Sequence, residues 1–136
     1  MIAYKVVSEG YNGPPMGKQR PRVCKGHAFT PAKTVAYEKL VKSVYHLKGL
    51  PALTGALEVN ITAYFPIPKS TPKKYLQGMK EGTTYHIKKG DADNVAKIIL
   101  DGLNGIAYED DGQVSILHIV KRYGEEPRVE VKLKEI

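Results

Sequence analysis

The alternation of apolar and polar side chains predicts a strand in the middle of the chain and shorter strands near both ends. The clearest run is Leu57 to Phe65, where apolar residues occupy every second position, as in a strand with one buried face. Pro66 and Pro68 end this strand, because proline cannot donate to a sheet ladder. The same period of two predicts strands over 2–6, 114–121 and 129–133, and a brief one over 84–88. The strands over 114–121 and 129–133 would form a hairpin around Gly124.

Two segments carry apolar side chains at the spacing of a helix that covers a core. The first begins at Thr30-Pro31, an N-cap followed by a proline in the first turn, and continues until Gly49 ends it. The second extends from about Asp91 to Leu103. Both helices are long enough to bury one apolar face against a sheet.

The segment over 66–90 is predicted to be a loop that contains one short helix. That helix would begin at Pro72 and be capped by Ser70 or Thr71. The resulting order, β-α-β-(loop)-α-β-β, does not repeat βαβ units throughout. It therefore favours the α+β class, with a mixed β-sheet and two main helices. With 136 residues, the chain suits a single domain over 1–136 that can bury a core.

Composition excludes several classes of protein. Hydrophobic residues make up 42% of the chain and charged residues 26%, which is ordinary for a globular protein and too apolar for a disordered one. Cys24 is the only cysteine, so an internal disulfide and a cysteine zinc site are both impossible. No apolar run approaches the ~18 residues of a membrane helix, and residues 1–10 lack the apolar stretch of a signal peptide. We therefore expect a cytoplasmic protein that makes no membrane contact.

The net charge of +7 is concentrated in separate blocks. Residues 1–33 carry six basic and one acidic side chains, and residues 66–90 repeat this ratio, so each block has a net charge of +5. Residues 91–112 reverse the sign, with Lys97 against six acids. Basic loops of this kind bind the phosphates of nucleic acids. The predicted DNA-binding residues are Lys18, Arg20, Arg22, Lys69, Lys73, Lys74, Lys88 and Lys89.

The acidic block places carboxylates at the start of the second predicted helix. Asp91 stands at the N-cap position and Asp93 in the first turn, which ordinary capping and the helix dipole would also explain. Lys97 and Asp101 follow at intervals of four, so a solvated salt-bridge ladder would give the same pattern. The second cluster, Glu109-Asp110-Asp111, precedes a strand that could return beside the helix start. Carboxylates that meet there would repel unless a hard cation lay between them, and Mg²⁺ prefers such oxygen ligands.

Other metal sites fit the sequence poorly. Counted from the first aspartate of the block, an EF-hand calcium loop needs an oxygen ligand, a glycine and a glutamate at its fifth, sixth and twelfth positions. The chain has Val95, Ala96 and Gly102 there. The four histidines show no spacing typical of zinc ligands. We expect His118 to be a packed or edge residue and not a metal ligand, and His86 to have a neutral or DNA-facing role and not a metal-binding one.

The acidic motifs resemble those of a known nuclease family. The chain contains Asp91-x-Asp93-Asn94-x-x-Lys97-x-x-x-Asp101-x-Leu103-Asn104-Gly105, followed by Asp110-Asp111-x-Gln113-Val114. This pattern resembles the RusA family of Holliday junction resolvases. Lys121 fits the family's basic tail, and the loop Pro15-x-x-Lys18-x-Arg20-Pro21-Arg22 is similar to its Lys/Arg-rich opening. Gly90 departs from the pattern, because many members carry proline before the first aspartate.

The resemblance implies a catalytic site of Asp91, Asp93 and Asp111, which would bind Mg²⁺, with Mn²⁺ as a substitute. Lys97 would be a catalytic or phosphate-contacting cation. Only one of Asp110 and Asp111 should reach the metal easily, because adjacent residues on an extended chain point to opposite faces. The resemblance also implies a homodimer that makes paired cuts in four-way junction DNA during recombination and repair. Binding to DNA would associate the protein with the nucleoid.

Two other functions are compatible with these residues. A metal-dependent nuclease that acts on flaps, forks or single strands would use the same site. A non-catalytic nucleic-acid-binding module would explain the basic loops, although six acids within 22 residues would then repel phosphate. Assays of several labelled DNA structures, with Mg²⁺ and with EDTA, separate these functions.

Overall fold

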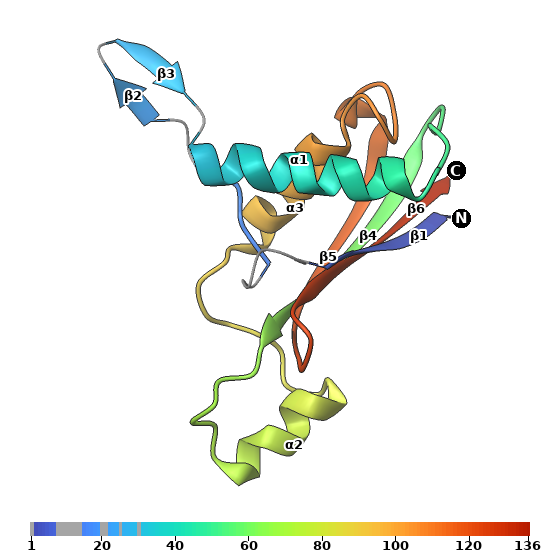
Figure 1. Cartoon of the computed structure of the whole chain (residues 1–136). Coiled ribbons are helices and arrows are strands. Elements are labelled where there is room, and N and C mark those ends of the chain that lie inside the picture. The colour runs from blue at the N-terminus through green and yellow to red at the C-terminus, as the bar shows by residue number, and fades with distance from the viewer. Residues whose placement is uncertain (1, 8–14, 20–21, 25, 30) are drawn as a thin grey trace.

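The computed structural model describes residues 2–7, 15–19, 22–24, 26–29 and 31–136. Its strands are β1 (Ile2–Val7), β2 (Arg22–Cys24), β3 (His27–Phe29), β4 (Leu57–Pro66), β5 (Val114–Gly124) and β6 (Arg128–Glu135). Its helices are α1 (Ala32–Leu47), α2 (Lys73–Glu81), α3 (Ala92–Leu103) and the short 3₁₀ turn η1 (Asp111–Gln113). Strands β2 and β3 pair in a separate ribbon, which projects beyond the start of α1 (Figure 1). No regular element was predicted for most of this ribbon.

Strand β4 lies at the centre of a four-stranded sheet. Its side chains alternate between buried and half-buried positions from Leu57 to Tyr64, as the sequence pattern predicts. It pairs in parallel with β5 and antiparallel with β6, and β6 pairs antiparallel with β1. The strand order is therefore β1-β6-β4-β5. This mixed sheet with its helices confirms the predicted α+β class.

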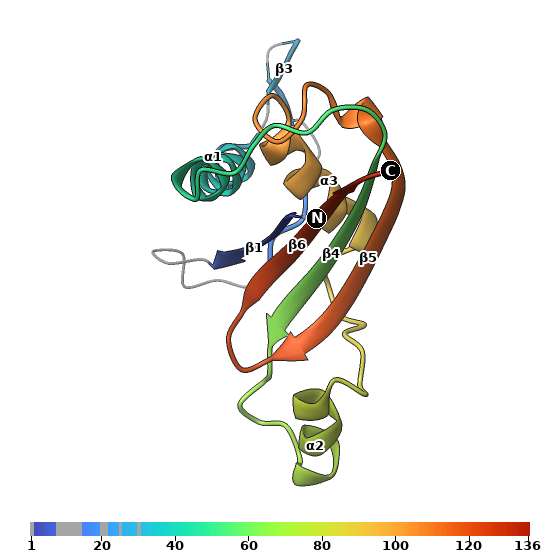
Figure 2. The ribbon, with the colours of Figure 1, turned by 90° about the vertical axis from the view of Figure 1, so that its right-hand side faces the viewer.

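The predicted hairpin around Gly124 is wrong, because β4 lies between β5 and β6. At the end of β4, Pro66 pairs with Gly124 of β5 and Tyr64 pairs with Arg128 of β6. The short connection between β5 and β6 therefore passes around the end of β4 (Figure 2). Burial explains this order, since Tyr123 is the single buried residue of β5 whereas β6 has three. A strand with so little buried surface suits the edge of a sheet.

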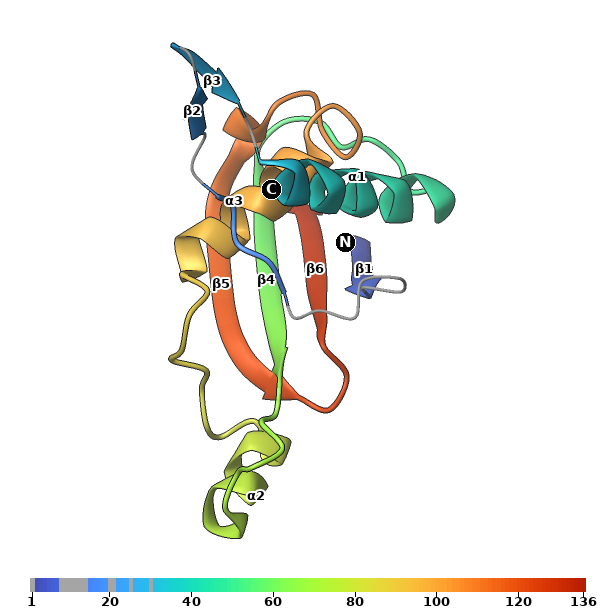
Figure 3. The same ribbon diagram turned by 60° about the vertical axis from the view of Figure 1, so that its left-hand side comes forward.

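Helices α1 and α3 lie on one face of the sheet and pack against each other (Figures 2 and 3). Gly102 of α3 allows the close approach of the two helices. A Cβ atom at this position would lie 2.9 Å from the Cβ of Val41 on α1, which is too close for well-packed side chains. The buried core residues of these helices are Tyr37, Val41, Tyr45, Val95, Ala96, Ile98, Ile99, Leu100 and Leu103.

All three predicted helices are present, but in two of them the N-cap lies one or two positions after the expected residue. Pro31 occupies the N-cap position of α1 in place of Thr30, which lies outside the described residues. Pro72 occupies the N-cap position of α2 in place of Ser70 or Thr71. Both prolines have an extended ψ, so the helical conformation starts only at the following residue. Among the helices of the described segments, none has the length and apolarity to cross a membrane.

Helix α2 stands apart from the helix layer, beyond the C-terminal end of β4 (Figures 1 and 3). The structure describes all of its residues, and none of them is buried. Arg122 of β5 holds the end of this helix by donating a hydrogen bond to the carbonyl of Gly82. The brief strand predicted over 84–88 is reduced to a single bridge between Tyr85 and Arg122.

Candidate active site

The start of α3 presents two carboxylates. Asp91 is the N-cap residue, as predicted, but its side chain accepts no hydrogen bond from the first-turn amides, all of which are described. Instead, Nδ2 of Asn94 donates to Oδ2 of Asp91 at 3.4 Å. Asp93 follows in the first turn, and both aspartates are exposed. Ordinary helix capping therefore does not explain Asp91, and both carboxylates are accessible to a ligand.

Lys97 joins the two acidic motifs. Its Nζ lies 3.1 Å from Oδ1 of Asp101 on α3 and 3.5 Å from Oδ2 of Asp111 in η1. The hydrogen bond to Asp101 raises the pKa of Lys97 above its ordinary value of 10.5 despite partial burial, and the charge of Asp111 adds to this effect. The ammonium group is therefore charged at neutral pH. The sequence placed the return of the second acidic cluster beside the start of α3. The structure instead brings Asp111 of this cluster to Lys97, in the second turn of the helix.

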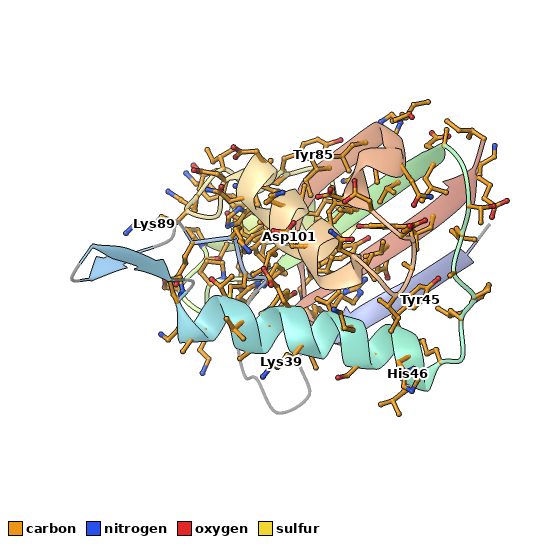
Figure 4. The ribbon with its side chains drawn as sticks, turned by 90° about the horizontal axis from the view of Figure 1, so that it is seen from above. Lys39, Tyr45, His46, Tyr85, Lys89 and Asp101 are labelled. Atoms are coloured by element: carbon orange, nitrogen blue, oxygen red, sulfur yellow. The ribbon has the colours of Figure 1, made fainter. Side chains whose placement is uncertain are left out.

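Asp101 also holds Lys18, which the sequence placed among the DNA-binding residues. Oδ2 of Asp101 lies 3.0 Å from Nζ of Lys18, which also contacts Glu38 of α1. Burial lowers the pKa of Lys18, but its hydrogen bonds to Glu38 and Asp101 outweigh burial and raise the pKa overall. Figure 4 shows Asp101 on α3, the helix that lies beside α1. Because the charge of Lys18 is already paired, its contact with DNA stays a prediction.

The segment over 15–19 runs along α3 (Figure 3). The backbone N–H of Lys18 donates to the carbonyl of Asn94 at 2.8 Å. At Gly17 there is little spare room, since an added Cβ would lie 3.2 Å from the Cβ of Asn94. This part of the basic opening loop is therefore positioned directly against the first turns of the acidic helix.

Gln113 sets the conformation of the second acidic motif. Its Oε1 accepts hydrogen bonds from the backbone N–H groups of Glu109 and Asp110, at 2.9 and 3.1 Å. Its Nε2 donates to the carbonyl of Gly55 at 3.0 Å. The side chain thus fastens the acidic loop to the segment that precedes β4. This explains why the motif contains glutamine two residues after its second aspartate.

Asp110 and Asp111 have different surroundings. Oδ2 of Asp110 accepts a hydrogen bond from the backbone N–H of Gly112 at 2.9 Å, which caps η1. The side chain of Asp111 contacts Lys97 instead. Asp110 is therefore engaged within its own loop, whereas Asp111 is oriented toward α3. Which of the two reaches a metal stays a prediction.

Tyr108 connects the acidic loop to the core below it. Its ring is buried, and its hydroxyl group donates to the carbonyl of Leu100 at 2.6 Å. Burial raises the pKa of Tyr108 above its ordinary value of 10, and the negative charges of the nearby aspartates raise it further. The phenol therefore stays neutral and holds the loop against α3.

The three predicted metal ligands suit Mg²⁺ by their chemistry. Asp91 and Asp93 are exposed and Asp111 is partly exposed, and carboxylate oxygen is the donor that Mg²⁺ prefers. Within the described residues, no three acidic, histidine or cysteine side chains lie close enough together to enclose an ion. The structure therefore does not gather the three ligands into a cage. Mg²⁺ commonly binds through one or two carboxylates, water and substrate phosphate, so this donor set still fits it.

Five of the predicted DNA-binding lysines are exposed. They are Lys69, Lys73, Lys74, Lys88 and Lys89. Lys121, which fits the family's basic tail, donates from Nζ to the carbonyl of Lys88 at 3.0 Å and so fastens that loop to β5. Arg20 and the side chain of Arg22 lie outside the described part of the chain. Their contact with DNA stays a prediction.

The two histidines singled out in the sequence have structural surroundings. His118 lies on the edge strand β5, as expected, and its Nε2 is 3.4 Å from Oε1 of Glu58. His86 is buried and stacks on Phe65 with 3.8 Å between the ring centroids. Burial lowers the pKa of His86, and the charges of nearby lysines lower it further. The imidazole is therefore uncharged at pH 7, and a DNA-facing role for His86 stays a prediction.

Asp101 and Gln113 are site residues that the sequence prediction did not include. Asp101 binds both lysines of the site; its spacing of four residues from Lys97 was interpreted in the sequence only as a solvated salt-bridge ladder. Gln113 stands in the family motif, but its role depends on a distant carbonyl group. No local pattern connects Lys18 with Asp101, because they come from different parts of the chain.

A basic α+β protein in which carboxylates and a charged lysine converge on one helix has the chemistry of a nuclease that hydrolyses phosphodiesters. The family model described as "Endodeoxyribonuclease RusA" matches residues 12–134. The chain therefore belongs to the RusA endodeoxyribonuclease family, and the resemblance seen in the sequence is confirmed. It is also similar to the "Uncharacterized protein YqaN" of Bacillus subtilis (strain 168). The two are 35% identical over 133 residues, which cover 91% of this chain and 92% of that protein.

Proposed function

We propose that the chain resolves four-way (Holliday) DNA junctions by Mg²⁺-dependent, paired hydrolysis of phosphodiesters during recombination and repair. Membership of a family of endodeoxyribonucleases supports the cleavage of DNA. The observation that carries the finer proposal is the contact between Lys97 and Asp111, because it joins the two acidic motifs on which the family resemblance rests. The positive charge outside these motifs supports a nucleic acid as substrate.

Asp91, Asp93 and Asp111 are the residues that would hold Mg²⁺, or Mn²⁺ as a substitute. The bound ion would supply a water of lowered pKa and neutralise charge on the phosphate oxygens. Because no side chain caps the first turn of α3, its backbone N–H groups are available to attract a phosphate oxygen to the same end of the helix.

Lys97 would contribute electrostatic stabilisation and not general-base catalysis. Its raised pKa keeps Nζ protonated at neutral pH, so it cannot take a proton from water. The ammonium group would instead stabilise the charge that develops on the phosphate oxygens as the bond to the leaving oxygen breaks. Asp101 holds Lys97 in position for this role. We expect the products to carry a 5′-phosphate and a 3′-hydroxyl group.

The exposed lysines would bind the arms of the junction. Lys69, Lys73 and Lys74 lie in or just before α2, which extends away from the sheet. Lys88 and Lys89 directly precede α3. Lysine contacts with phosphate position DNA without reading its sequence, so this surface supports recognition of junction shape. Such binding would associate the protein with the nucleoid.

A homodimer would present two sites to two opposed strands of one junction. The edge of β5 supports such a contact, because its outer side has no neighbouring strand among the described residues. Ile116 and Leu117 on this strand are exposed although both are large and apolar, and pairing with a second copy would cover them. Leu47 at the end of α1 is also exposed and apolar.

The test is a panel of labelled substrates, each incubated with Mg²⁺ and with EDTA. Symmetric nicking of the four-way junction supports the proposal. Cleavage of flaps, forks or single strands with an intact junction would assign the same site to a different nuclease. Binding without cleavage of any substrate would indicate a non-catalytic module.

Asp93→Asn tests the assignment of the carboxylates. Asparagine keeps the size of the side chain but removes its charge, so we expect junction affinity to persist while Mg²⁺-dependent cleavage falls by at least about 100-fold. Affinity is measured in EDTA and cleavage in single turnover. The control is Ser43→Ala, which changes an exposed polar residue of α1 outside the site. A change at Asn94 would not serve, because Asn94 lies in the same turn as Asp93. Cleavage by Asp93→Asn at the rate of the Ser43→Ala control would exclude Asp93 from the site.

A further inference from the structure

A pocket of about 680 Å³ lies beside the candidate active site. It is enclosed by the segment over 15–19, the end of β4, α2 and the loop that leads into α3, and most of its lining is apolar. Its volume lies within the range of pockets that bind small organic groups, roughly 300–1,000 Å³. The lining residues used below are Met16, Phe65, Met79, His86, Lys88 and Tyr123.

Three rings form the buried side of this pocket. Phe65 and His86 are stacked nearly parallel, with 3.8 Å between centroids and an interplanar angle of 8°. Tyr123 meets His86 edge to face at 5.1 Å. The Nδ1 atom of His86 is buried and has no hydrogen-bond partner among the described residues. The three rings thus form a packed aromatic wall on the buried side of the pocket.

The pocket extends to the residue that precedes the acidic site. Gly90 lines it and is followed directly by Asp91, the first candidate ligand. On the opposite side, Gly17 lines it and approaches Asn94 of α3. A group in the pocket would therefore lie next to whatever phosphate the site holds.

The rim of the pocket is positively charged. Lys88 and Lys89 both line it and are both exposed. Lys121 contacts the carbonyl of Lys88, and its Nζ lies 5.7 Å from the ring centroid of Phe65. An apolar interior with a cationic rim complements a ligand that has a flat apolar part and an attached phosphate.

We propose that this pocket binds one unpaired nucleobase of the DNA, adjacent to the phosphate that is cut. The proposal rests on the proposed function, because it assumes that DNA occupies the acidic site. The base would pack against the apolar lining while its flanking phosphates contact Lys88 and Lys89. Bases at a strand exchange are less well stacked than bases within a duplex, and such bases cost little to displace. The pocket therefore gives the protein a way to recognise distorted DNA without reading base edges in a groove.

The methionines allow a direct test. The chain has three, and two of them, Met16 and Met79, line the pocket. We would label the methionine methyl groups with ¹³C in the full chain and titrate it, in EDTA, with a short single-stranded oligonucleotide. A second titration uses an oligonucleotide of equal length in which every base is absent. We expect the Met16 and Met79 signals to shift only with the first, because the ring current of a base requires its presence in the pocket.

Two outcomes of this titration would overturn the proposal. Equal shifts with both oligonucleotides would mean that only the backbone binds. The absence of shifts at saturating oligonucleotide would mean that no base enters the pocket. Shifts that instead follow protein concentration without DNA would assign the pocket to a second copy of the chain, which also contradicts the proposal.

A substitution in α2 provides the matched control. Met79→Trp would fill the pocket, whereas Gln77→Trp adds the same ring at an exposed position of the same helix. In EDTA, we expect removal of one base at the strand exchange to weaken binding of the junction about tenfold in the wild type and in Gln77→Trp. Met79→Trp should bind intact and base-free junctions equally. An equal loss in all three proteins would contradict the proposal.

Cleavage is measured separately, so the two proposals fail in different ways. Base-dependent methyl shifts in a protein that cuts no junction would contradict the proposed function and retain the pocket. Junction cleavage in a protein whose binding is insensitive to the base would retain the proposed function and exclude the pocket.

Discussion

Replacing Asp101 with asparagine tests whether this residue positions Lys97. In the wild type, Oδ1 of Asp101 lies 3.1 Å from Nζ of Lys97 and Oδ2 lies 3.0 Å from Nζ of Lys18. Asparagine has nearly the same shape, but it carries no charge and one of its two terminal atoms is a donor. It can therefore accept from only one of the two ammonium groups. Lys97 would lose its nearest anion, and Lys18 would keep Glu38.

The structure predicts a small loss of stability and a larger loss of cleavage. The side chain of Lys97 is 54% exposed, and ion pairs with such exposure contribute roughly 0.2–1 kcal/mol each. The loss of two pairs should therefore lower the free energy of unfolding by about 0.5–2 kcal/mol. Cleavage depends on where Nζ lies relative to the phosphate, and a displacement of about 1 Å costs about 100-fold. We expect the cleavage rate to fall about 10- to 100-fold, while junction affinity changes little.

The assay is single-turnover cleavage of a labelled junction at saturating protein and Mg²⁺. It compares Asp101→Asn, Lys97→Met and the double variant. Glu38→Gln is the control, because it removes the other anion beside Lys18 and leaves the contacts of Lys97 intact. Urea unfolding of each variant shows that the folded state is populated.

If Asp101 acts through Lys97, the double variant cleaves no more slowly than Lys97→Met. This follows because Asp101 has nothing left to position once the ammonium group is absent. Losses that multiply in the double variant would show that Asp101 acts independently. Cleavage by Asp101→Asn at the wild-type rate, or an equal loss in Glu38→Gln, would refute the reasoning.

Three further predictions concern packing, pH and DNA binding. Overpacking against Val41 costs about 1–3 kcal/mol, and alanine regains about 1 kcal/mol in a helix. Gly102→Ala should therefore lower the free energy of unfolding in urea by up to about 2 kcal/mol; a gain in stability would contradict the close helix contact. Burial and nearby lysines lower the pKa of His86 in the folded protein below its ordinary value of 6.5. The folded state therefore keeps its full stability above pH 6.5, where the imidazole is neutral, and loses part of it as the pH falls through the lowered pKa. Urea unfolding at about pH 7.5 and about pH 5 should show this loss in the wild type and less of it in His86→Phe, and equal losses would exclude His86. The paired change Lys73→Met and Lys74→Met should reduce the slope of log affinity against log salt by about 2, and an unchanged slope would remove both lysines from the DNA interface.

The sequence predicted which segments form helices and strands better than it predicted which strands lie side by side. Period-two alternation identified β4, and helical spacing identified α3 within one residue of its start. These patterns report which side chains face the core. They contain no information on which strands pair. The placement of β4 between β5 and β6 depends on the small buried surface of β5, which becomes apparent only once the whole sheet is assembled.

In the candidate site, too, local sequence patterns predicted some features and tertiary contacts determined the others. The choice of Asp111 over Asp110 came from the family resemblance, and the alternation of an extended chain indicated only that one of the two would reach the metal. The structure separates the two residues for another reason. Asp110 caps the 3₁₀ turn, and Gln113 holds that turn through its own hydrogen bonds. The pairing of Lys18 with Asp101 could not be predicted, since it depends on how 15–19 lies along α3. Local motifs therefore indicated the chemistry, and tertiary contacts determine which side chains are available for it.

Gly90 links these observations, because it is the position at which the chain departs from the family pattern. Its φ of +111° is a conformation that proline, fixed near −65°, cannot adopt. A Cβ atom at this position would lie 3.0 Å from Cζ of Phe65, so even alanine would disturb the aromatic wall of the pocket. Glycine thus allows the backbone to pass over Phe65 immediately before Asp91. In the structure, this glycine joins the apolar pocket to Asp91, the first residue of the acidic site.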